Sequence, residues 1–473
     1  MIGKKSCQFF IAFLAAVLLS VFFGAASAFA AAPAVQVDSG DTTWLLVATA
    51  IVIFMHVPGL ALFYGGLVSD RNVVSTMMHS FVSLLVVTIV WVLWGYTLAF
   101  GTDIGGFIGG FDYLGFQGVG PEAAFGTYTI PHYIFAMFQC AFAAITVAII
   151  SGGIAGRISF PAWILFSAVW VTVIYAPMAH WVWGGGWLAQ LGELDFAGGT
   201  VVHILSGVSA LTAAIVIGPR FEHLKKSHSP HNIVLFLIGA ATLWFGWFGF
   251  NAGSALGANG LTALVFANTQ IAAAAGGLGW LFVEWSIRRR PTLVGTATGA
   301  IAGLVGITPA AGFVTVPAAL IIGLIAAPVS YFGIHFVKSR FKYDDTLDAF
   351  GVHGIAGIWG ALATGLFATT AVNEAGKNGL FYGNPELLMH QAIGVGTALV
   401  LGCAGTFLIL KGIGLFMPLR VSREEEEMGL DISFHEEPAY SPSNAEPLSM
   451  TDSIQKEAPL NASLKTDPPG PIV

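Results

Sequence analysis

Two histidines lie inside segments that are otherwise built from apolar and small residues. His203 belongs to DFAGGTVVHILSG (195–207) and His353 belongs to DAFGVHGIAGIWG (348–360). A neutral imidazole has one donor nitrogen and one acceptor nitrogen, and it changes its charge near neutral pH. Two such rings in contact would offer hydrogen bonds without a fixed charge, or a route for a proton. The alternative interpretation is that each histidine is satisfied separately in the core.

Haem ligation is a further interpretation, because histidines on membrane helices can bind iron. The sequence contains no C-x-x-C-H attachment motif and only three cysteines, Cys7, Cys140 and Cys403. Their spacing also excludes a disulfide framework or a C-x-x-C metal site. We therefore expect no metal and no cofactor.

Aromatic residues are clustered in three other segments. MFQCAF (137–142) places Phe138 and Phe142 four residues apart, on one face of a helix. Trp183 lies in WVWGGGW (181–187), and WFGWFGFNAGS (244–254) contains Trp247, Phe250 and Ser254. One interpretation is a belt of aromatic residues at the membrane interface. The other is a cation–π site for a small cation, with Ser254 accepting a hydrogen bond from it.

The composition indicates that membrane-spanning helices position these residues. The chain is 56% hydrophobic and 10% charged over 473 residues, whereas soluble domains are about 25% charged. Apolar runs of about 20 residues, long enough to cross a bilayer as helices, recur along the chain. We predict an all-α polytopic membrane protein with eleven spans, at 42–67, 74–100, 131–154, 160–181, 199–218, 232–256, 261–286, 292–309, 313–336, 349–371 and 389–416.

The ends of the chain differ from this membrane domain, which we place at 31–419. Residues 1–30 combine Lys4 and Lys5 with an apolar core and small residues, a pattern typical of a signal peptide. Residues 420–473 are acidic and then polar and proline-rich, so we expect a cytoplasmic C-terminal region that is disordered after about 441. The tail contains no appended enzymatic domain, and we expect no enzymatic activity.

Basic residues predict the orientation in the membrane. Arg71, Arg157, Arg220 and the clusters at 288–290 and 338–342 lie in alternate connections, while the opposite connections contain only Lys377. By the positive-inside rule, the mature N-terminus is outside and the C-terminus is cytoplasmic. This agrees with an exported N-terminus and an odd number of helices.

The two histidine segments also suggest an internal repeat. Each histidine follows an aspartate and a glycine near the start of a span, the fifth for His203 and the tenth for His353. Asp195 and Asp348 directly precede these spans, so we expect both to be helix N-caps. Spans five apart run in opposite directions, as in a five-plus-five inverted repeat. The two imidazoles would then meet near the middle of the membrane.

Several motifs, in this order, closely resemble the ammonium transporter (Amt) family, which is distantly related to the Rhesus glycoproteins. They are FYGGLVSDRNVVS (63–75), DFAGGTVVH (195–203), WFGFNAGS (247–254), GLVGITPAAG (303–312), DAFGVHG (348–354) and EEEEMGLDISFHEEPAY (424–440). The resemblance extends from about residue 40 to about residue 440 and includes every span. It implies eleven helices in a pseudo-twofold core, with a central pore in each subunit of a homotrimer. Glu436 departs from the glycine often found in the tail motif of the family.

The resemblance also implies roles for individual residues. His203 and His353 match the twin histidines of the pore, and Phe142 and Phe250 match the stacked rings that close it. Trp183, Phe138 and Ser254 match an outer recruitment site for ammonium, with Asp195 as its supporting acidic residue. Trp247, Thr308, Phe63 and Gln139 match further positions in the pore region.

The implied mechanism is that ammonium binds outside, loses its proton near the stacked rings and crosses as ammonia past the histidines. A proton relay through the histidines would make transport electrogenic. The resemblance implies the inner cell membrane as the location and a PII-type signal protein as a cytoplasmic partner; no nucleic acid is implied. The alternatives are an ammonium sensor and a Rhesus-like channel for neutral ammonia or carbon dioxide.

Overall fold

The computed structural model describes residues 35–221, 223 and 229–440. The predicted signal peptide and the segment predicted to be disordered after about 441 lie outside these residues. Within them, ten helices are long and apolar enough to cross a membrane, and an eleventh, Leu293–Ile307, is shorter. The prediction of eleven spans is therefore confirmed. Their ends agree with the predicted ranges to within a few residues, except where 313–336 extends to Phe341 and 160–181 extends to Leu191.

Several spans are composed of more than one helical segment. The first half of the chain contains α2 (Ser39–Phe54), η1 (Met55–Leu60), α3 (Ala61–Leu67), η2 (Asp70–Asn72), α4 (Val73–Val90), η3 (Trp91–Gly95), α5 (Tyr96–Phe100), α6 (His132–Ile154), α7 (Phe160–Trp170), η6 (Val171–Tyr175), α8 (Ala176–Val182), α9 (Trp187–Leu191), η7 (Gly199–Ile204) and α10 (Leu205–Ile217). Between α5 and α6 lie a short hairpin, β1 (Asp103–Ile104) and β2 (Ile108–Gly109), and two 3₁₀ turns, η4 (Leu114–Phe116) and η5 (Ala124–Gly126).

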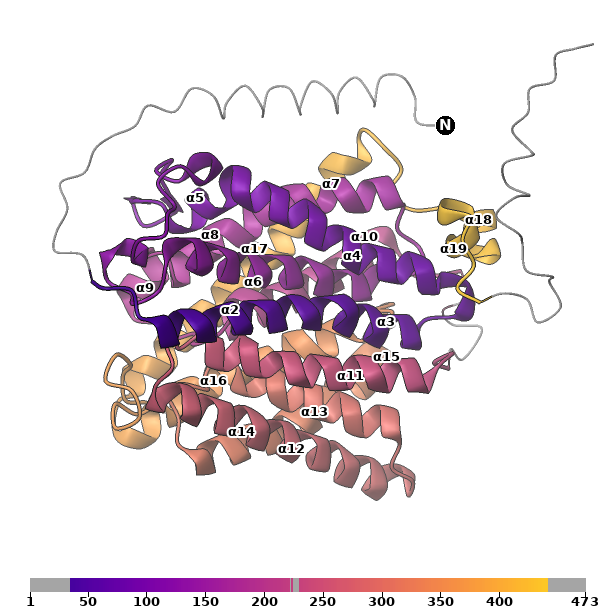
Figure 1. Ribbon diagram of the computed structural model, residues 1–473. Coiled ribbons are helices and arrows are strands. Elements are labelled where there is room, and N and C mark those ends of the chain that lie inside the picture. The colour runs from indigo at the N-terminus through magenta and orange to yellow at the C-terminus, as the bar shows by residue number, and fades with distance from the viewer. Residues whose placement is uncertain (1–34, 222, 224–228, 441–473) are drawn as a thin grey trace, which may run out of the picture.

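The second half contains α11 (Ile233–Trp247), η8 (Phe248–Ala252), α12 (Gly260–Arg288), α13 (Leu293–Ile307), α14 (Val316–Phe332), η9 (Gly333–Val337), α15 (Lys338–Phe341), η10 (Phe350–Gly354) and α16 (Ile355–Phe367). It is followed by η11 (Leu380–Tyr382) and α17 (Pro385–Gly414), and then by α18 (Arg423–Met428) and α19 (Leu430–His435). Figure 1 shows the long helices lying side by side, with α18 and α19 at one end of the bundle and α9 at the other. We call these the tail end and the α9 end.

The two halves pack against each other reciprocally. The helix α10 of the first half contacts η10 of the second, and α16 of the second half contacts η7 of the first. The close approach depends on glycine, because a Cβ on Gly207 would overlap the backbone nitrogen of Gly354. This exchange of contacts between corresponding elements is what a five-plus-five inverted repeat requires. It also brings the starts of the fifth and tenth spans together.

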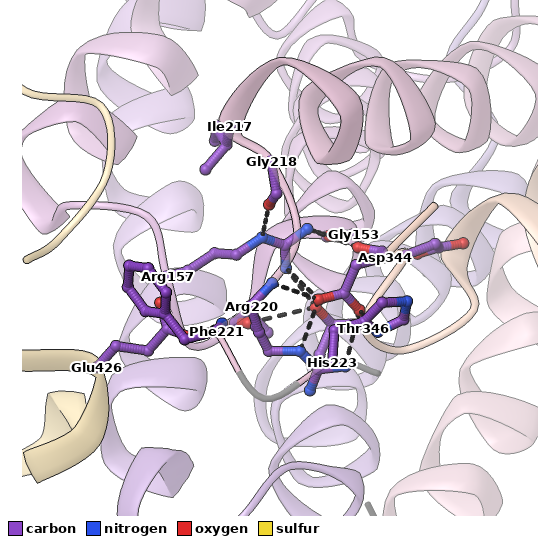
Figure 2. A network of polar contacts seen from close by, with 12 residues as sticks. Gly153, Arg157, Ile217, Gly218, Arg220, Phe221, His223, Asp344, Thr346 and Glu426 are labelled. Atoms are coloured by element: carbon purple, nitrogen blue, oxygen red, sulfur yellow. Dashed lines mark hydrogen bonds and ion pairs between the residues drawn. The ribbon is translucent and has the colours of Figure 1, made fainter. Parts of the chain in front are cut away.

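A polar network centred on the buried Asp344 joins the two halves at the tail end (Figure 2). The carboxylate of Asp344, in the segment before η10, accepts hydrogen bonds from Arg220 Nε at 2.9 Å and Nη2 at 2.8 Å. The Nδ1 atom of His223 lies 2.9 Å from Asp344 Oδ1. Burial opposes ionisation of Asp344, but the Arg220 hydrogen bonds and the Arg157 charge outweigh it and hold the Asp344 pKa well below its usual range.

Arg157 extends this network to the loop between α6 and α7. Its buried guanidinium donates to Gly218 O at 2.8 Å and to Gly153 O at 2.9 Å. The start of the tail pairs with the same loop, because Ser159 N donates to Leu419 O and Val421 N donates to Arg157 O. The tail then docks on α4, where Ser75 N donates to Asp431 Oδ1 at 2.8 Å. The described part of the C-terminal region is therefore an ordered component of this end of the bundle.

Candidate functional site

His203 and His353 are in direct contact. Their Nδ1 atoms are 3.2 Å apart, and their ring planes are inclined at 28° with centroids 5.3 Å apart. Each ring lies on a π-helical turn, His203 on η7 and His353 on η10. Both are buried, at 1% and 5% exposure. Because two Nδ1 atoms can share only one proton, one ring donates to the other. The expected contact between the histidines is therefore confirmed.

Asp195 organises the turn that carries His203. Its Oδ1 accepts hydrogen bonds from Gly198 N at 2.8 Å and Gly199 N at 2.6 Å, and its Oδ2 accepts from Thr200 N and Val201 N. These are the N–H groups that have no partner at the start of a helix. The expected capping role of Asp195 is confirmed, with one carboxylate receiving four donors.

Asp348 does not have the corresponding role before His353, so its predicted N-cap is wrong. Asp345 caps this turn instead, accepting from Ala349 N at 3.1 Å and Phe350 N at 2.8 Å. Asp348 has a left-handed backbone, with φ of 58°, and its carboxylate pairs with Lys338 Nζ at 2.7 Å. The Asp348 carboxylate is therefore engaged away from the N–H groups at the start of η10, and Asp345, three residues earlier, accepts from them instead. Asp345 precedes His353 by eight residues, as Asp195 precedes His203, and this spacing is the signal that could have identified it.

Two phenylalanine rings are stacked beside the histidine pair. Phe142 on α6 and Phe250 on η8 have centroids 4.1 Å apart and planes only 12° apart. Phe250 is also 5.8 Å from the His203 ring, which stacks on Trp247 at 5.4 Å. The indole of Trp247 donates to Thr308 Oγ1 at 2.9 Å. Thr308 therefore holds Trp247 against the histidine, without lining the cavity described below.

The predicted recruitment residues lie near the α9 end of this stack. The Phe138 and Phe142 ring centroids are 4.8 Å apart, and the Trp183 and Phe142 rings are nearly perpendicular, with centroids 6.1 Å apart. The Trp183 indole donates to the backbone oxygen of Asp195 at 2.8 Å. The Ser254 hydroxyl donates to Phe250 O at 2.9 Å, so its lone pairs remain available to accept.

The two remaining predicted residues have less direct relationships with the histidines. Gln139 follows Phe138 on α6, and its buried Oε1 has no hydrogen-bond partner within the described part of the chain. Phe63 on α3 packs against Phe236 at 4.7 Å and does not line the cavity beside the histidines.

A narrow cavity lies beside both histidines. Its wall combines the rings of His203, His353, Trp247 and Phe250 with aliphatic residues from several helices. Such a cavity can bind a small neutral molecule through hydrogen bonds to imidazole, while its apolar wall disfavours ions. Sequence reasoning missed the aliphatic lining residues, Met55, Leu60, Ile145, Ile149, Val202 and Leu243.

Comparisons with known proteins agree with this architecture. The model of the Ammonium Transporter Family matches residues 43–440. An ammonium transporter of Bacillus subtilis (strain 168) is 53% identical over 406 residues, which cover 85% of this chain and 99% of the relative. The ammonium transporter Amt1 of Archaeoglobus fulgidus is 46% identical over 404 residues, covering 85% of this chain and 100% of the relative.

Solved structures show the same likeness. The crystal structure of Saccharomyces cerevisiae Mep2 superposes with a TM-score of 0.77 at 36% identity, covering 82% of this chain and 90% of that one. A protein described as a sensor Amt protein has a TM-score of 0.77 at 32% identity, covering 84% and 98% of the two chains.

Proposed function

The chain belongs to the ammonium transporter family, and from this membership we propose that its ammonium transport proceeds by deprotonation at the outside and conduction of ammonia past His203 and His353. The contact between the two imidazoles, at 3.2 Å, is the observation that carries the proposal. Under the orientation proposed from the basic residues, the α9 end faces outward and the tail end faces the cytoplasm. Ammonium then meets Trp183 first and the histidine pair afterwards.

The cost of moving an ion supports conduction of the neutral form. Transferring an ion of this size from water to a low-dielectric medium costs on the order of 20 kcal/mol in the idealised Born limit. Each cation–π contact contributes only about 0.5–2 kcal/mol. The aromatic cluster can therefore recruit the cation, but it cannot stabilise it along a narrow cavity walled by Leu60, Ile145 and their aliphatic neighbours. Ammonia avoids most of this cost and still accepts and donates hydrogen bonds.

Four residues form the proposed outer site. Trp183 and Phe138 present aromatic rings to the cation, and Ser254 accepts one of its hydrogen bonds. The carboxylate of Asp195 is saturated by four N–H donors, so its role is to hold the segment and to contribute negative charge. Phe142 and Phe250, stacked at 4.1 Å, form the gate that separates this site from the cavity.

The histidines supply hydrogen bonds without a fixed charge. With one ring donating to the other, each ring keeps its Nε2 as a further polar atom. The Nε2 of His203 is buried and has no partner among the described residues, so it is available to ammonia. The shared Nδ1 proton also provides a link through which a proton can pass separately. We propose that this relay makes transport electrogenic.

The proposal is tested by replacing His353 with alanine and measuring ammonium-evoked current and pH change in liposomes. We expect loss of ammonium flux or of selectivity over potassium, because His203 loses its partner. His79→Ala is the matched control, since His79 is fully buried but packs against Trp163 at 5.6 Å rather than against the cavity. Unchanged flux and selectivity in His353→Ala would show that the histidines are packing residues.

We further propose that the protein forms a homotrimer and binds a PII-type signal protein at the tail end. Family membership supports both partners. At the tail end, a cavity of about 240 Å³ is lined by Arg71, Arg220, Phe221 and Glu426 and is open to such a partner.

The likeness to a sensor Amt protein favours sensing as the second candidate function. Ammonium uptake by cells that lack their own transporters would distinguish transport from sensing alone.

A further inference from the structure

Glu193 is a buried carboxyl group that the proposed transport mechanism does not use. It lies between α9 and η7, and its residue is 4% exposed. Helix α17 covers it, since a Cβ on Gly394 would approach Glu193 Cγ to 2.8 Å. Its Oε1 accepts a hydrogen bond from Thr200 Oγ1 at 2.7 Å. Its Oε2 is buried and has no hydrogen-bond partner among the described residues.

Glu193 and Asp195 are neighbouring carboxyl groups in unequal surroundings. Asp195 accepts four backbone N–H bonds, whereas Glu193 accepts a single hydroxyl bond. Donors of this kind stabilise the ionised form of a carboxyl group, and two adjacent carboxylates disfavour each other. When the pair holds one proton, Glu193 is therefore the residue that carries it. A protonated Glu193 also needs no cation nearby.

Among the described residues, no cationic group forms an ion pair with Glu193. On α17, His390 lies one turn before Gly394, but its Nε2 faces Glu386 at 3.6 Å. Lys377, from the segment between α16 and α17, packs its Nζ against Gly192. Burial first, and then the charge of Asp195, raise the pKa of Glu193 to about 8, while the Thr200 hydrogen bond opposes the shift. Burial also raises the pKa of Asp195, but its four donors limit that effect.

The segment that contains Glu193 is connected to the proposed outer site. The backbone oxygen of Asp195 holds the Trp183 indole, and Thr200 belongs to the turn that carries His203. A second negative charge behind Asp195 would attract a cation at Trp183 through a medium of low dielectric constant. We infer that Glu193 controls the affinity of the outer site for ammonium through its own protonation. It is protonated in neutral and acidic surroundings, and its ionisation at alkaline pH strengthens ammonium recruitment. This inference rests on the proposed function of the outer site.

Two measurements on the reconstituted full-length protein test the inference. The first is the ammonium concentration at half-maximal current, expressed as the cation, from about pH 6 to about pH 10, on either side of the pKa of about 8. We expect the affinity of the wild type to rise several-fold across this range. Glu193→Gln should keep the low-pH affinity throughout. Glu386→Gln is the control, because the Glu386 side chain is 66% exposed, and it should behave like the wild type.

The second measurement does not depend on transport. Infrared spectra of the wild type without ammonium should show the carbonyl band of a buried protonated carboxyl group, which disappears as the pH is raised. Glu193→Gln should lack this band. Absence of the band from the wild type, or a wild-type pH profile in Glu193→Gln, would overturn the inference. If the band titrates but the protein carries no ammonium current, the proposed function is overturned, and with it the role of Glu193 in ammonium recruitment. The infrared result would still show that Glu193 carries the proton.

Discussion

The Nδ1 atoms of His203 and His353 lie 3.2 Å apart, although 150 residues separate the two histidines in the chain. Each ring projects from an irregular turn at the start of a helix, and in each half an aspartate eight residues earlier holds that turn. The turns place the two side chains at the interface between the halves of the repeat. Because each half contributes one histidine, neither half alone can form the pair. The pairing is therefore a product of the interface between halves.

Trp183 provides the first test of the outer site. Trp183→Leu removes a cation–π partner worth about 0.5–2 kcal/mol, so half-maximal current should require about 2- to 30-fold more ammonium. The maximal current should change less, because the histidines and the gate remain. Trp181→Leu is the control, since the Trp181 indole donates to Phe107 O, away from the stack. Equal shifts in the two variants would contradict a role in recruitment.

Phe250 tests the gate. Phe250→Leu retains an apolar side chain but removes the ring stacked on Phe142 at 4.1 Å. We expect faster osmotic water flow and a measurable potassium flux in proteoliposomes, because the barrier between the outer site and the cavity is thinner. Phe248→Leu removes an equivalent stack, on Phe266 at 4.1 Å, that faces away from the cavity. A gate role for Phe250 is wrong if both variants remain as impermeable to water and potassium as the wild type.

Replacing Asp345 with alanine should lower stability and ammonium flux much more than replacing Asp348. Asp345→Ala leaves the buried N–H of Ala349 and the partly buried N–H of Phe350 without an acceptor. An unpaired buried donor costs about 1–3 kcal/mol, so this variant should lower both thermal stability and ammonium flux. Asp348→Ala removes one ion pair to Lys338, and partly exposed pairs contribute about 0–1 kcal/mol. Thermal unfolding in detergent and flux in liposomes measure the two effects. A larger loss in Asp348→Ala would restore Asp348 as the capping residue.

Asp344 predicts a dependence of stability on pH. Its folded pKa lies below the ordinary value of 3.8, so the folded state binds fewer protons than the unfolded state below about pH 4. The stability that Asp344 contributes is present above this value and is lost as the pH falls through the folded pKa. Asp344→Asn should therefore lower the melting temperature at neutral pH, and the difference from wild type should shrink at about pH 3. Asp70→Asn, at an exposed position, is the control, and a difference that does not shrink would contradict this assignment.

The sequence predicted the spans well because bilayer thickness imposes a length of apolar sequence that is easy to recognise. The contact between His203 and His353 followed from their equivalent places in oppositely directed spans. The Asp348 prediction failed because we assigned the N-cap to the residue directly before the apolar run. In the structure, Asp345, three residues earlier, accepts from the first N–H of η10. Lining residues such as Met55 and Val202 could not be predicted, because apolar residues that face a cavity resemble those that face lipid or another helix.

The polar network around Asp344 has a consequence for how the transporter moves. It joins the residues that follow α10 in one half to the segment before η10 in the other, through hydrogen bonds between the charged Arg220 and the buried carboxylate of Asp344. Alternating access by rocking one half against the other would have to break these bonds in every cycle. We therefore expect a rigid frame in which only side chains such as the Phe142 and Phe250 rings rotate. Rotations of this kind are fast compared with domain motions, so passage should resemble flow through a channel.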